Sequence, residues 1–290
     1  MKGIILAGGT GTRLFPMTSA FSKHLLPIYD KPMIYYPLSL MMLFGIKDIC
    51  FICTAHDMPF YEALLGDGSR LGINIIYEIQ DQPKGIPDAF LLSEKHFAGE
   101  KICLMLGDNV FYIPRYELFF EDCLNLDKGA VIFGYNVKDP ERFGVAEVDE
   151  NGFVLSIEEK PKNPKSNLAV PGLYFYDERV FDYAKKLQPS ARGELEIGDI
   201  NNIYLKNKEL KLKTFGRSAI WLDCGTSDSL VESSNLIKQI ETMQGIKIAC
   251  LEEIAIKKGY SSKEEISSWL SLNKSKSSYI EYLRKICEYK

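Results

Sequence analysis

A glycine-rich loop with one fixed positive charge stands near the start of the chain. The stretch GIILAGGTGTRLFPMT (3–18) places four glycines around the end of an apolar run and follows them with Arg13. Glycine lets the backbone approach a ligand closely, and a loop of exposed amides forms an anion-binding concavity. The guanidinium of Arg13 is a permanently charged, forked donor suited to phosphate oxygens. Lys23 can add a second charge, so the stretch predicts a phosphate site.

Two better-known glycine loops do not fit this stretch. Counted from Gly9, the third glycine of a dinucleotide G-x-G-x-x-G fingerprint falls on Leu14. A Walker loop needs glycine, lysine and then serine or threonine, and no such tripeptide occurs in the chain. A Rossmann-type oxidoreductase is therefore disfavoured, although a glycine-rich turn beside a surface arginine remains a competing interpretation.

Two aspartates end apolar runs that are typical of buried strands. Asp108 closes ICLMLGD and Asp223 closes AIWLD. In open α/β sheets, ligands bind outside the carboxyl ends of the strands. Mg²⁺ takes oxygen ligands and keeps several waters, so two such carboxylates could hold one ion. An aspartate in an ordinary turn is the competing interpretation for each residue alone.

Composition limits the setting in which this chemistry operates. The chain has 290 residues and a net charge of −4, and its basic residues are spread along the sequence, so nucleic acid is not an expected partner. No apolar run is long enough to cross a bilayer, and the start has no signal-peptide pattern, so a cytoplasmic location without membrane contact is expected. Seven cysteines give no disulfide pattern. Cys50 and Cys53 should be buried thiols on opposite faces of a strand.

The elements that must position these residues alternate between strands and helices. Apolar runs predict strands at 4–7, 47–55, 73–79, 101–108 and 129–137, while helical spacing appears at 32–46 and 86–97. Such alternation predicts a mainly parallel sheet covered on both faces, which is an α/β fold.

The pattern changes after residue 140. Alternating runs on either side of Asn151-Gly152 predict a β-hairpin. A strand at 170–177, a helix within 193–207, and a strand at 211–226 entering a turn follow, and Ser262 with Glu265 suits a capping box in the helices that begin near 228. We expect one continuous domain, with a core at 1–228 and a helical appendage at 229–290 packed on it.

Several motifs in order resemble the sugar-1-phosphate nucleotidylyltransferases, and most closely their thymidylyltransferase branch. They are LAGGTGTRLFPMT, SKHLLPIYDKPMIYYPLSLMM, LGDNVFY, the stretch from DPERFG to LYFYD, PSARGELEIGDIN, WLDCGT and EEIAIKKGY, and together they cover nearly the whole chain. The resemblance implies a three-layer Rossmann-like fold, one Mg²⁺ and a homotetramer. It also implies dTTP and glucose 1-phosphate as substrates, and a product used in dTDP-rhamnose-type deoxysugar and surface polysaccharide synthesis.

The resemblance assigns roles residue by residue. The implied catalytic residues are Arg13, Lys23, Asp108, Lys160 and Asp223, with the metal on Asp108 and Asp223. The implied nucleotide-binding residues are Leu6, Gly8, Gly9, Gly11, Thr12, Arg13, Lys23, Gln80, Gly85 and Asp108, of which Gln80 and Gly85 read the imide edge of thymine. The implied sugar-phosphate residues are Leu106, Asn109, Tyr112, Gly144, Glu159, Lys160, Val170, Tyr174 and Trp221. For Leu106 and the aromatic residues, core packing is the competing interpretation.

Some positions depart from the usual pattern of these relatives. The chain reads QDQPKGIPDAF (80–90) where QPSPDGLAQAF is usual, and Phe143, His24 and Cys224 replace tyrosine, glutamine and threonine. No charged catalytic group is lost. A uridylyltransferase, or a thymidylyltransferase acting on another hexose 1-phosphate, therefore stays open as an alternative. A non-catalytic sugar-nucleotide-binding regulator is a more remote alternative, because it should have lost one of the charged residues.

Overall fold

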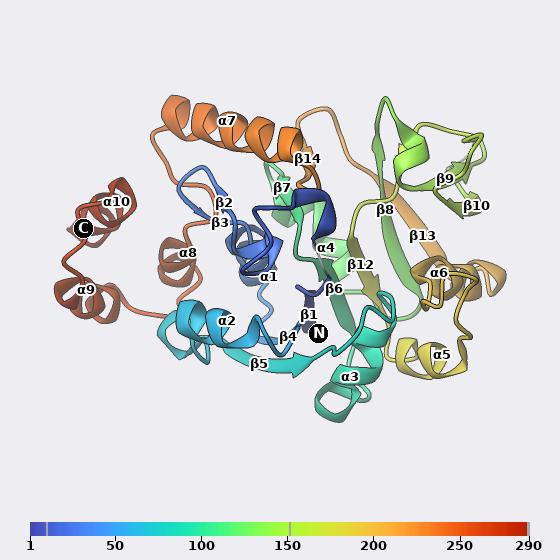
Figure 1. Cartoon of the computed structure of the whole chain (residues 1–290), viewed down its shortest axis with the longest axis horizontal. Coiled ribbons are helices and arrows are strands. Elements are labelled where there is room, and N and C mark those ends of the chain that lie inside the picture. The colour runs from blue at the N-terminus through green and yellow to red at the C-terminus, as the bar shows by residue number, and fades with distance from the viewer. Residues whose placement is uncertain (10, 151, 289–290) are drawn as a thin grey trace.

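The computed structural model describes residues 1–9, 11–150 and 152–288, and its centre is one large sheet flanked by helices (Figure 1). The sheet runs in the order β10-β9-β11-β8-β12-β6-β1-β4-β5, with β13 beside β8. Its strands are β1 (Lys2–Leu6), β4 (Asp48–Cys53), β5 (Asn74–Ile79), β6 (Ile102–Leu106), β8 (Ala130–Asn136), β9 (Gly144–Val148), β10 (Val154–Glu159), β11 (Leu168–Ala169), β12 (Leu173–Tyr176) and β13 (Leu210–Thr214).

The first half of the sheet is parallel, as the alternating pattern predicts. β1 pairs in parallel with β4 and β6, and β4 with β5, so the carboxyl ends of four strands meet at one edge. Successive side chains of a strand point to opposite faces. Ile5 and Cys53 accordingly join one core cluster, and Ile4 and Cys50 join the other. The predicted buried thiols on opposite faces of β4 are confirmed.

Helices cover both faces and complete three layers. One core cluster takes side chains from α1 (Tyr35–Leu43), α2 (Met58–Leu65), α4 (Tyr116–Leu124) and α8 (Leu251–Lys257). The other takes them from α3 (Asp88–Phe97), α5 (Val180–Lys186) and α6 (Ile197–Lys206). Burying one large apolar side chain of this kind contributes about 1.5–3 kcal/mol. The two cores therefore hold the sheet rigidly, including the edge at which its parallel strands end.

The second half of the sheet is largely antiparallel. β12 runs antiparallel to β6 and to β8, and β9 and β10 form the predicted hairpin. The Asn151 of its turn lies outside the described residues. Within this half, β12 begins beside the carboxyl end of β6, where Leu173 pairs with Met105.

A separate two-stranded sheet contains Asp223 at the end of one strand and begins its other strand directly after Asp108. β7 (Asn109–Tyr112) leaves the main sheet after β6 and pairs antiparallel with β14 (Ile220–Asp223). The prediction of one strand over 211–226 is wrong, because this run divides into β13 in the main sheet and β14 in the small one. The turn between them contains Gly216 and Ser218, which favour a break in the strand.

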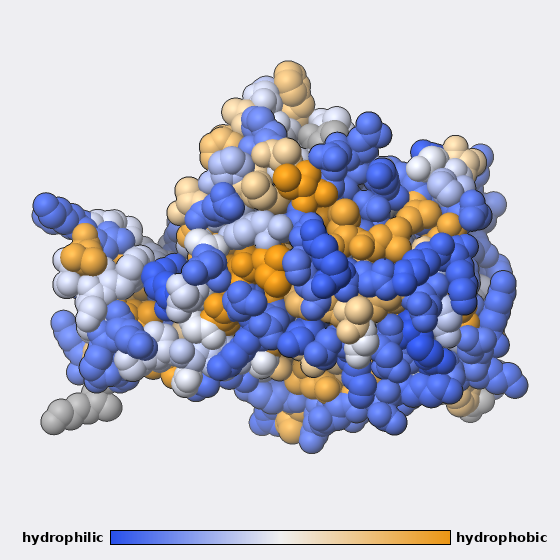
Figure 2. Space-filling model, turned by 90° about the horizontal axis from the view of Figure 1, so that it is seen from below, coloured by the Kyte–Doolittle hydropathy of each residue, from blue (hydrophilic) through white to orange (hydrophobic). Residues whose placement is uncertain are grey.

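The carboxyl-terminal region is helical, with α7 (Ser227–Gln244), α8, α9 (Lys263–Leu272) and α10 (Ser278–Glu288). The capping box of Ser262 and Glu265 is confirmed at the start of α9. Helices α9 and α10 lie at the end of the molecule beyond α8 (Figure 1), and they share a small core with Cys250 at the start of α8. Within the described residues, no helix is long and apolar enough to span a membrane. The face seen from below the view of Figure 1 is mostly hydrophilic, with apolar residues gathered near its middle (Figure 2).

Candidate functional site

The two aspartates meet where the main sheet and the small sheet join. Asp108 lies between β6 and β7, and Asp223 ends β14 opposite Asn109. The amide of Cys224 donates to the backbone carbonyl of Asp108 at 3.1 Å, which ties the two segments together. Burial, and then the negative charge of Asp108, raises the pKa of Asp223. The pair therefore concentrates negative charge at the point where the strands end.

Lys23 and His24 lie directly against Asp108. The ammonium of Lys23 donates to Oδ2 of Asp108, and Nδ2 of Asn109 donates to Oδ1 at 2.8 Å. Burial alone would favour the neutral acid, but the charge of Lys23 and the hydrogen bonds from Lys23 and Asn109 together outweigh it and lower the pKa of Asp108 to about 2. Burial and then Lys23 lower the pKa of His24 to about 3, so this imidazole is neutral. It packs against Gly107, where a Cβ would lie 2.7 Å from its Cδ2.

The glycine loop brings Arg13 to the same place. Gly11 has a φ of 58° in the left-handed region, and a Cβ there would lie 2.9 Å from Cγ2 of Thr18. Arg13 follows in a single short 3₁₀ turn, Thr12–Leu14. If Gly225 carried a Cβ, that atom would lie 2.9 Å from Nη2 of Arg13 and 3.3 Å from Oδ1 of Asp223. Gly225 thus leaves room for the guanidinium beside the second aspartate.

The residues predicted to contact the nucleotide frame one side of this centre. Leu6 ends β1, and its carbonyl accepts a hydrogen bond from Gly107 at 2.9 Å. Gln80 follows β5, and its Oε1 would lie 3.3 Å from a Cβ on Gly8. A cavity of about 320 Å³ opens there, lined by Gly9, residues 18–22, Thr54, His56, Asp57 and residues 80–83. Its size falls within the range of small-molecule sites.

Four of the residues predicted to contact the sugar phosphate lie together on the other side. The amide of Val170 donates to the carbonyl of Gly144 at 2.8 Å. A Cβ on Gly144 would lie 3.1 Å from Oε2 of Glu159, and the ammonium of Lys160 lies 3.3 Å from Oε1 of the same carboxylate. Tyr174 is buried on β12, and burial, followed by the charges of Glu159 and Asp108, raises the pKa of its hydroxyl.

The remaining predicted residues are engaged by the protein itself. Oδ1 of Asn109 accepts from Nε1 of Trp221 at 2.7 Å and from the amide of Gly172 at 2.9 Å. Leu106 packs on Gly172, where a Cβ would lie 2.5 Å from its Cδ1. The hydroxyl of Tyr112 accepts a hydrogen bond from Gln244 at the end of α7. Sugar contacts for these four residues stay predictions.

Two arginines that the sequence analysis did not single out lie at this edge. Nη2 of Arg142 is 3.9 Å from Oδ2 of Asp223, and its Nη1 is 2.5 Å from Asp139. Arg192 pairs with Glu196 at 2.8 Å, and the field of Glu159 also reaches it, since both acids raise the pKa of its guanidinium. In the sequence, Arg142 stands two residues before Gly144 in DPERFG, and Arg192 stands next to Gly193 in SARGEL.

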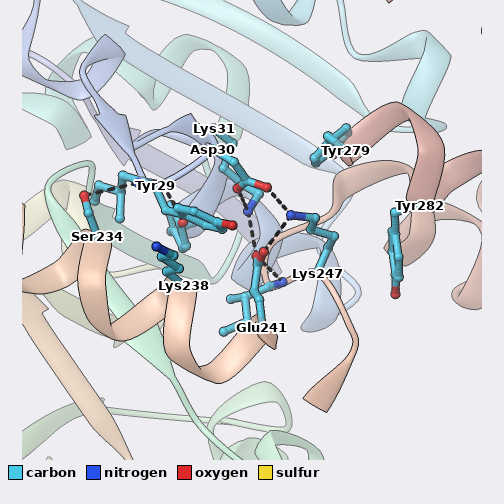
Figure 3. A network of polar contacts seen from close by, with 12 residues as sticks. Tyr29, Asp30, Lys31, Ser234, Lys238, Glu241, Lys247, Tyr279 and Tyr282 are labelled. Carbon is cyan, nitrogen blue, oxygen red and sulfur yellow. Dashed lines mark hydrogen bonds and ion pairs between the residues drawn. The ribbon is translucent and has the colours of Figure 1, made fainter. Parts of the chain in front are cut away.

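A buried network of charges fixes the hairpin that follows Lys23 (Figure 3). The hairpin consists of β2 (Pro27–Ile28) and β3 (Lys31–Pro32). Lys31, 1% exposed, donates to Asp30 and, at 2.9 Å, to Oε1 of Glu241 on α7. Lys247 donates to Asp30 and, at 2.9 Å, to Oε2 of Glu241. We name Asp30, Lys31, Glu241 and Lys247 the four-charge network. It ties the segment carrying Lys23 to the carboxyl-terminal helices.

This arrangement of two clustered aspartates, facing cations and a glycine loop at the carboxyl edge of a sheet is that of an enzyme acting on phosphates. A sequence profile described as nucleotidyl transferase matches residues 2–240, so the chain belongs to the nucleotidyl transferase family. Similar proteins bear a narrower name. Glucose-1-phosphate thymidylyltransferase of Neisseria gonorrhoeae is 50% identical over 283 residues, 98% of each chain. The enzyme of that name from Mycobacterium tuberculosis is 48% identical and covers 92% of each chain.

Solved structures agree with this fold. A crystal structure described as a glucose-1-phosphate thymidylyltransferase of Bacillus anthracis with sucrose has a TM-score of 0.76 and 44% identity, covering 81% of this chain and 94% of its own. UDP-glucose pyrophosphorylase in complex with UDP-glucose has a TM-score of 0.70 and 23% identity, covering 82% of this chain and 98% of its own. The second likeness concerns the fold alone. The predicted three-layer α/β nucleotidyltransferase fold is confirmed.

Proposed function

We propose that the chain transfers the thymidylyl group of dTTP to glucose 1-phosphate and releases dTDP-glucose and pyrophosphate. The observation that supports nucleotidyl transfer is that two acids and two cations meet at one sheet edge: Asp108, Asp223, Lys23 and Arg13. The names of the similar enzymes, about half identical over nearly the whole chain, supply the substrates.

The proposed reaction requires cations and positioning more than a general base. An oxygen of the sugar phosphate attacks the α-phosphorus of dTTP, the bond from that phosphorus to the bridging oxygen breaks, and pyrophosphate leaves. A phosphate monoester is already anionic at neutral pH, so no proton has to be removed. Arg13 would hold the triphosphate end, and Lys160 would hold the sugar phosphate. Both act by fixing the reactants and offsetting their charge.

The two aspartates fit a magnesium ion. Burial, and then the charge of Asp108, raises the pKa of Asp223, and a divalent cation would offset the repulsion between the two carboxylates. Two carboxylates from the protein suit an ion that keeps several waters. When bound, Mg²⁺ would supply charge neutralisation at the reacting phosphate.

The base preference gives the first prediction. Gln80 and the backbone of Gly85 would read the imide edge that thymine and uracil share, so dTTP should be used best and UTP to a useful extent. The missing methyl of uracil is worth only about 1–3 kcal/mol. CTP inverts the donor and acceptor pattern, leaves polar groups unpaired and should be rejected more strongly. Rates of pyrophosphate release for dTTP, UTP, CTP and ATP against several hexose 1-phosphates test this. Equal use of CTP and dTTP, or a preference for ATP, would contradict it.

The two phosphate ends give the second prediction. Arg13→Ala should mainly raise the KM for dTTP, and Lys160→Ala should mainly raise the KM for glucose 1-phosphate. Each change removes a charge-assisted contact that contributes roughly 1.5–3 kcal/mol. Lys162→Ala, another basic residue of the same segment, is the matched control. If Arg13→Ala and Lys160→Ala both raised the KM of one substrate only, the assignment of ends would be wrong.

The setting of the enzyme follows from the same proposal. We propose that the chain works as a homotetramer in the cytoplasm, and that dTDP-glucose enters deoxysugar synthesis of the dTDP-rhamnose type for surface polysaccharide. Light scattering measured with size-exclusion chromatography tests the assembly.

A further inference from the structure

A buried carboxylate that the proposed reaction does not use holds the side chain of Gln80. Gln80 follows β5, Asp88 opens α3, and each is 7% exposed. Nε2 of Gln80 donates to Oδ2 of Asp88 at 2.9 Å and makes a longer contact of 3.4 Å with the carbonyl of Gly85. The protein therefore engages both hydrogens of this amide nitrogen.

The amide oxygen of Gln80, unlike the amide nitrogen, is not engaged by the described part of the protein. Oε1 lies toward the glycine loop, where a Cβ on Gly8 would be 3.3 Å away. In the part of the chain that the structure describes, Oε1 accepts no hydrogen bond from the protein. An ionised carboxylate accepts hydrogen bonds and donates none. Asp88 thus favours the amide orientation in which the oxygen, and not the nitrogen, faces the loop.

The parts that hold this amide are themselves fixed. Ala89 and Phe90, the next residues of α3, are fully buried in the core beneath the sheet. The carbonyl of Lys84 accepts a hydrogen bond from the amide of Leu195 at 2.8 Å. Gly85 has a φ of 96°, and a Cβ there would lie 2.0 Å from the carbonyl oxygen of Leu195, so its backbone has little freedom. The orientation of Gln80 is therefore set by a rigid surround.

We propose that Asp88 is a positioning residue that sets base specificity by fixing the orientation of the Gln80 amide. This inference rests on the proposed function. The fixed oxygen accepts a hydrogen bond from the N3–H of thymine or uracil. Cytosine carries a lone pair on N3, which would face the lone pairs of the amide oxygen, so the site rejects it by repulsion as well as by a missing hydrogen bond. An amide free to rotate would present its nitrogen to cytosine instead.

The test replaces the carboxylate by an amide. Asp88→Asn can donate as well as accept, so Gln80 would populate both orientations. We expect the ratio of kcat/KM for dTTP to that for CTP to fall about tenfold or more, largely through increased use of CTP, since one oriented hydrogen bond is exchanged. Asp88→Glu retains an acceptor-only group and should keep most of the ratio. Asp127→Asn, an exposed aspartate that does not line this cavity, is the matched control.

The outcomes separate this inference from the proposed function. If the wild type prefers dTTP and Asp88→Asn leaves its dTTP to CTP ratio unchanged, the inference is wrong and the proposed function stands. If Asp88→Asn lowers the use of dTTP and CTP in equal proportion, Asp88 only supports the fold, and the inference is again wrong. Calorimetric binding of dTDP and CDP to each variant gives the same comparison without turnover. A wild type that does not use dTTP would contradict the proposed function and this inference together.

Discussion

Replacing Asp108 or Asp223 by asparagine should lower kcat by about a thousandfold or more while the fold survives. The asparagine side chain has nearly the same shape, but its neutral amide is a weaker Mg²⁺ ligand. The loss corresponds to about 4 kcal/mol of transition-state stabilisation. Asp108→Asn also removes the partner of the Lys23 ammonium, so its effect should be at least as large as that of Asp223→Asn. Pyrophosphate release measures kcat, and circular dichroism and Tm report on the fold.

The metal itself can be removed in the same assay. EDTA should abolish the activity of the wild type, and added Mg²⁺ should restore it. Asp228→Asn, an exposed acid in the first turn of α7, is the matched control and should retain nearly full activity. Full activity in EDTA, or turnover near the wild-type value in both variants, would show that the aspartates hold no essential metal.

Replacing Glu241 by glutamine should lower the free energy of unfolding by about 3–5 kcal/mol, the usual cost of breaking a buried ion pair from one side. Glu241, 4% exposed in its side chain, accepts from Lys31, from Lys247 and from the amide of Ile248. Glutamine offers one acceptor oxygen and no charge, so Lys31 would stay buried with Asp30 as its only acid partner in the four-charge network. Urea denaturation gives the free energy directly.

A matched change on the same helix gives the control for this prediction. Glu232→Gln alters an exposed carboxylate of α7 and should change stability by less than about 1 kcal/mol. Equal stability of the two variants would mean that the four-charge network contributes little to folding. A measurement at several salt concentrations should leave the Glu241 effect largely unchanged, because buried pairs are screened less than exposed ones.

Sequence patterns predicted much of the fold because they reflect local physics. The buried strands of the parallel half are continuous apolar runs, and the capping box at Ser262 and the hairpin of β9 and β10 depend on neighbours a few residues away. The division of 211–226 was not predictable from periodicity. Both β13 and β14 read as strands, and only pairing with β8 or with β7 decides to which sheet each belongs.

The sequence motifs predicted residues for the candidate site but not the contacts between them. The motifs located Asp108 and Asp223, whereas their closeness depends on the pairing of β7 with β14. The bond from Gln80 to Asp88 and the position of Arg13 beside Gly225 depend on side-chain placement that spacing alone does not determine. Arg192 was missed because an arginine in an exposed loop is common, and only the folded chain sets it near Glu159.

The four-charge network has a consequence for how this chain can be recombined with its relatives. The match to the family profile ends at residue 240, and the acceptor of Lys31 is the very next residue, Glu241. A hybrid joined at that boundary would keep a buried lysine from the hairpin and take whatever counter-charge the other parent supplies. Lys31 and Glu241 are 210 positions apart, yet they must be exchanged together. In a chimera, the hairpin of β2 and β3 should therefore come from the same parent as residues 241–247.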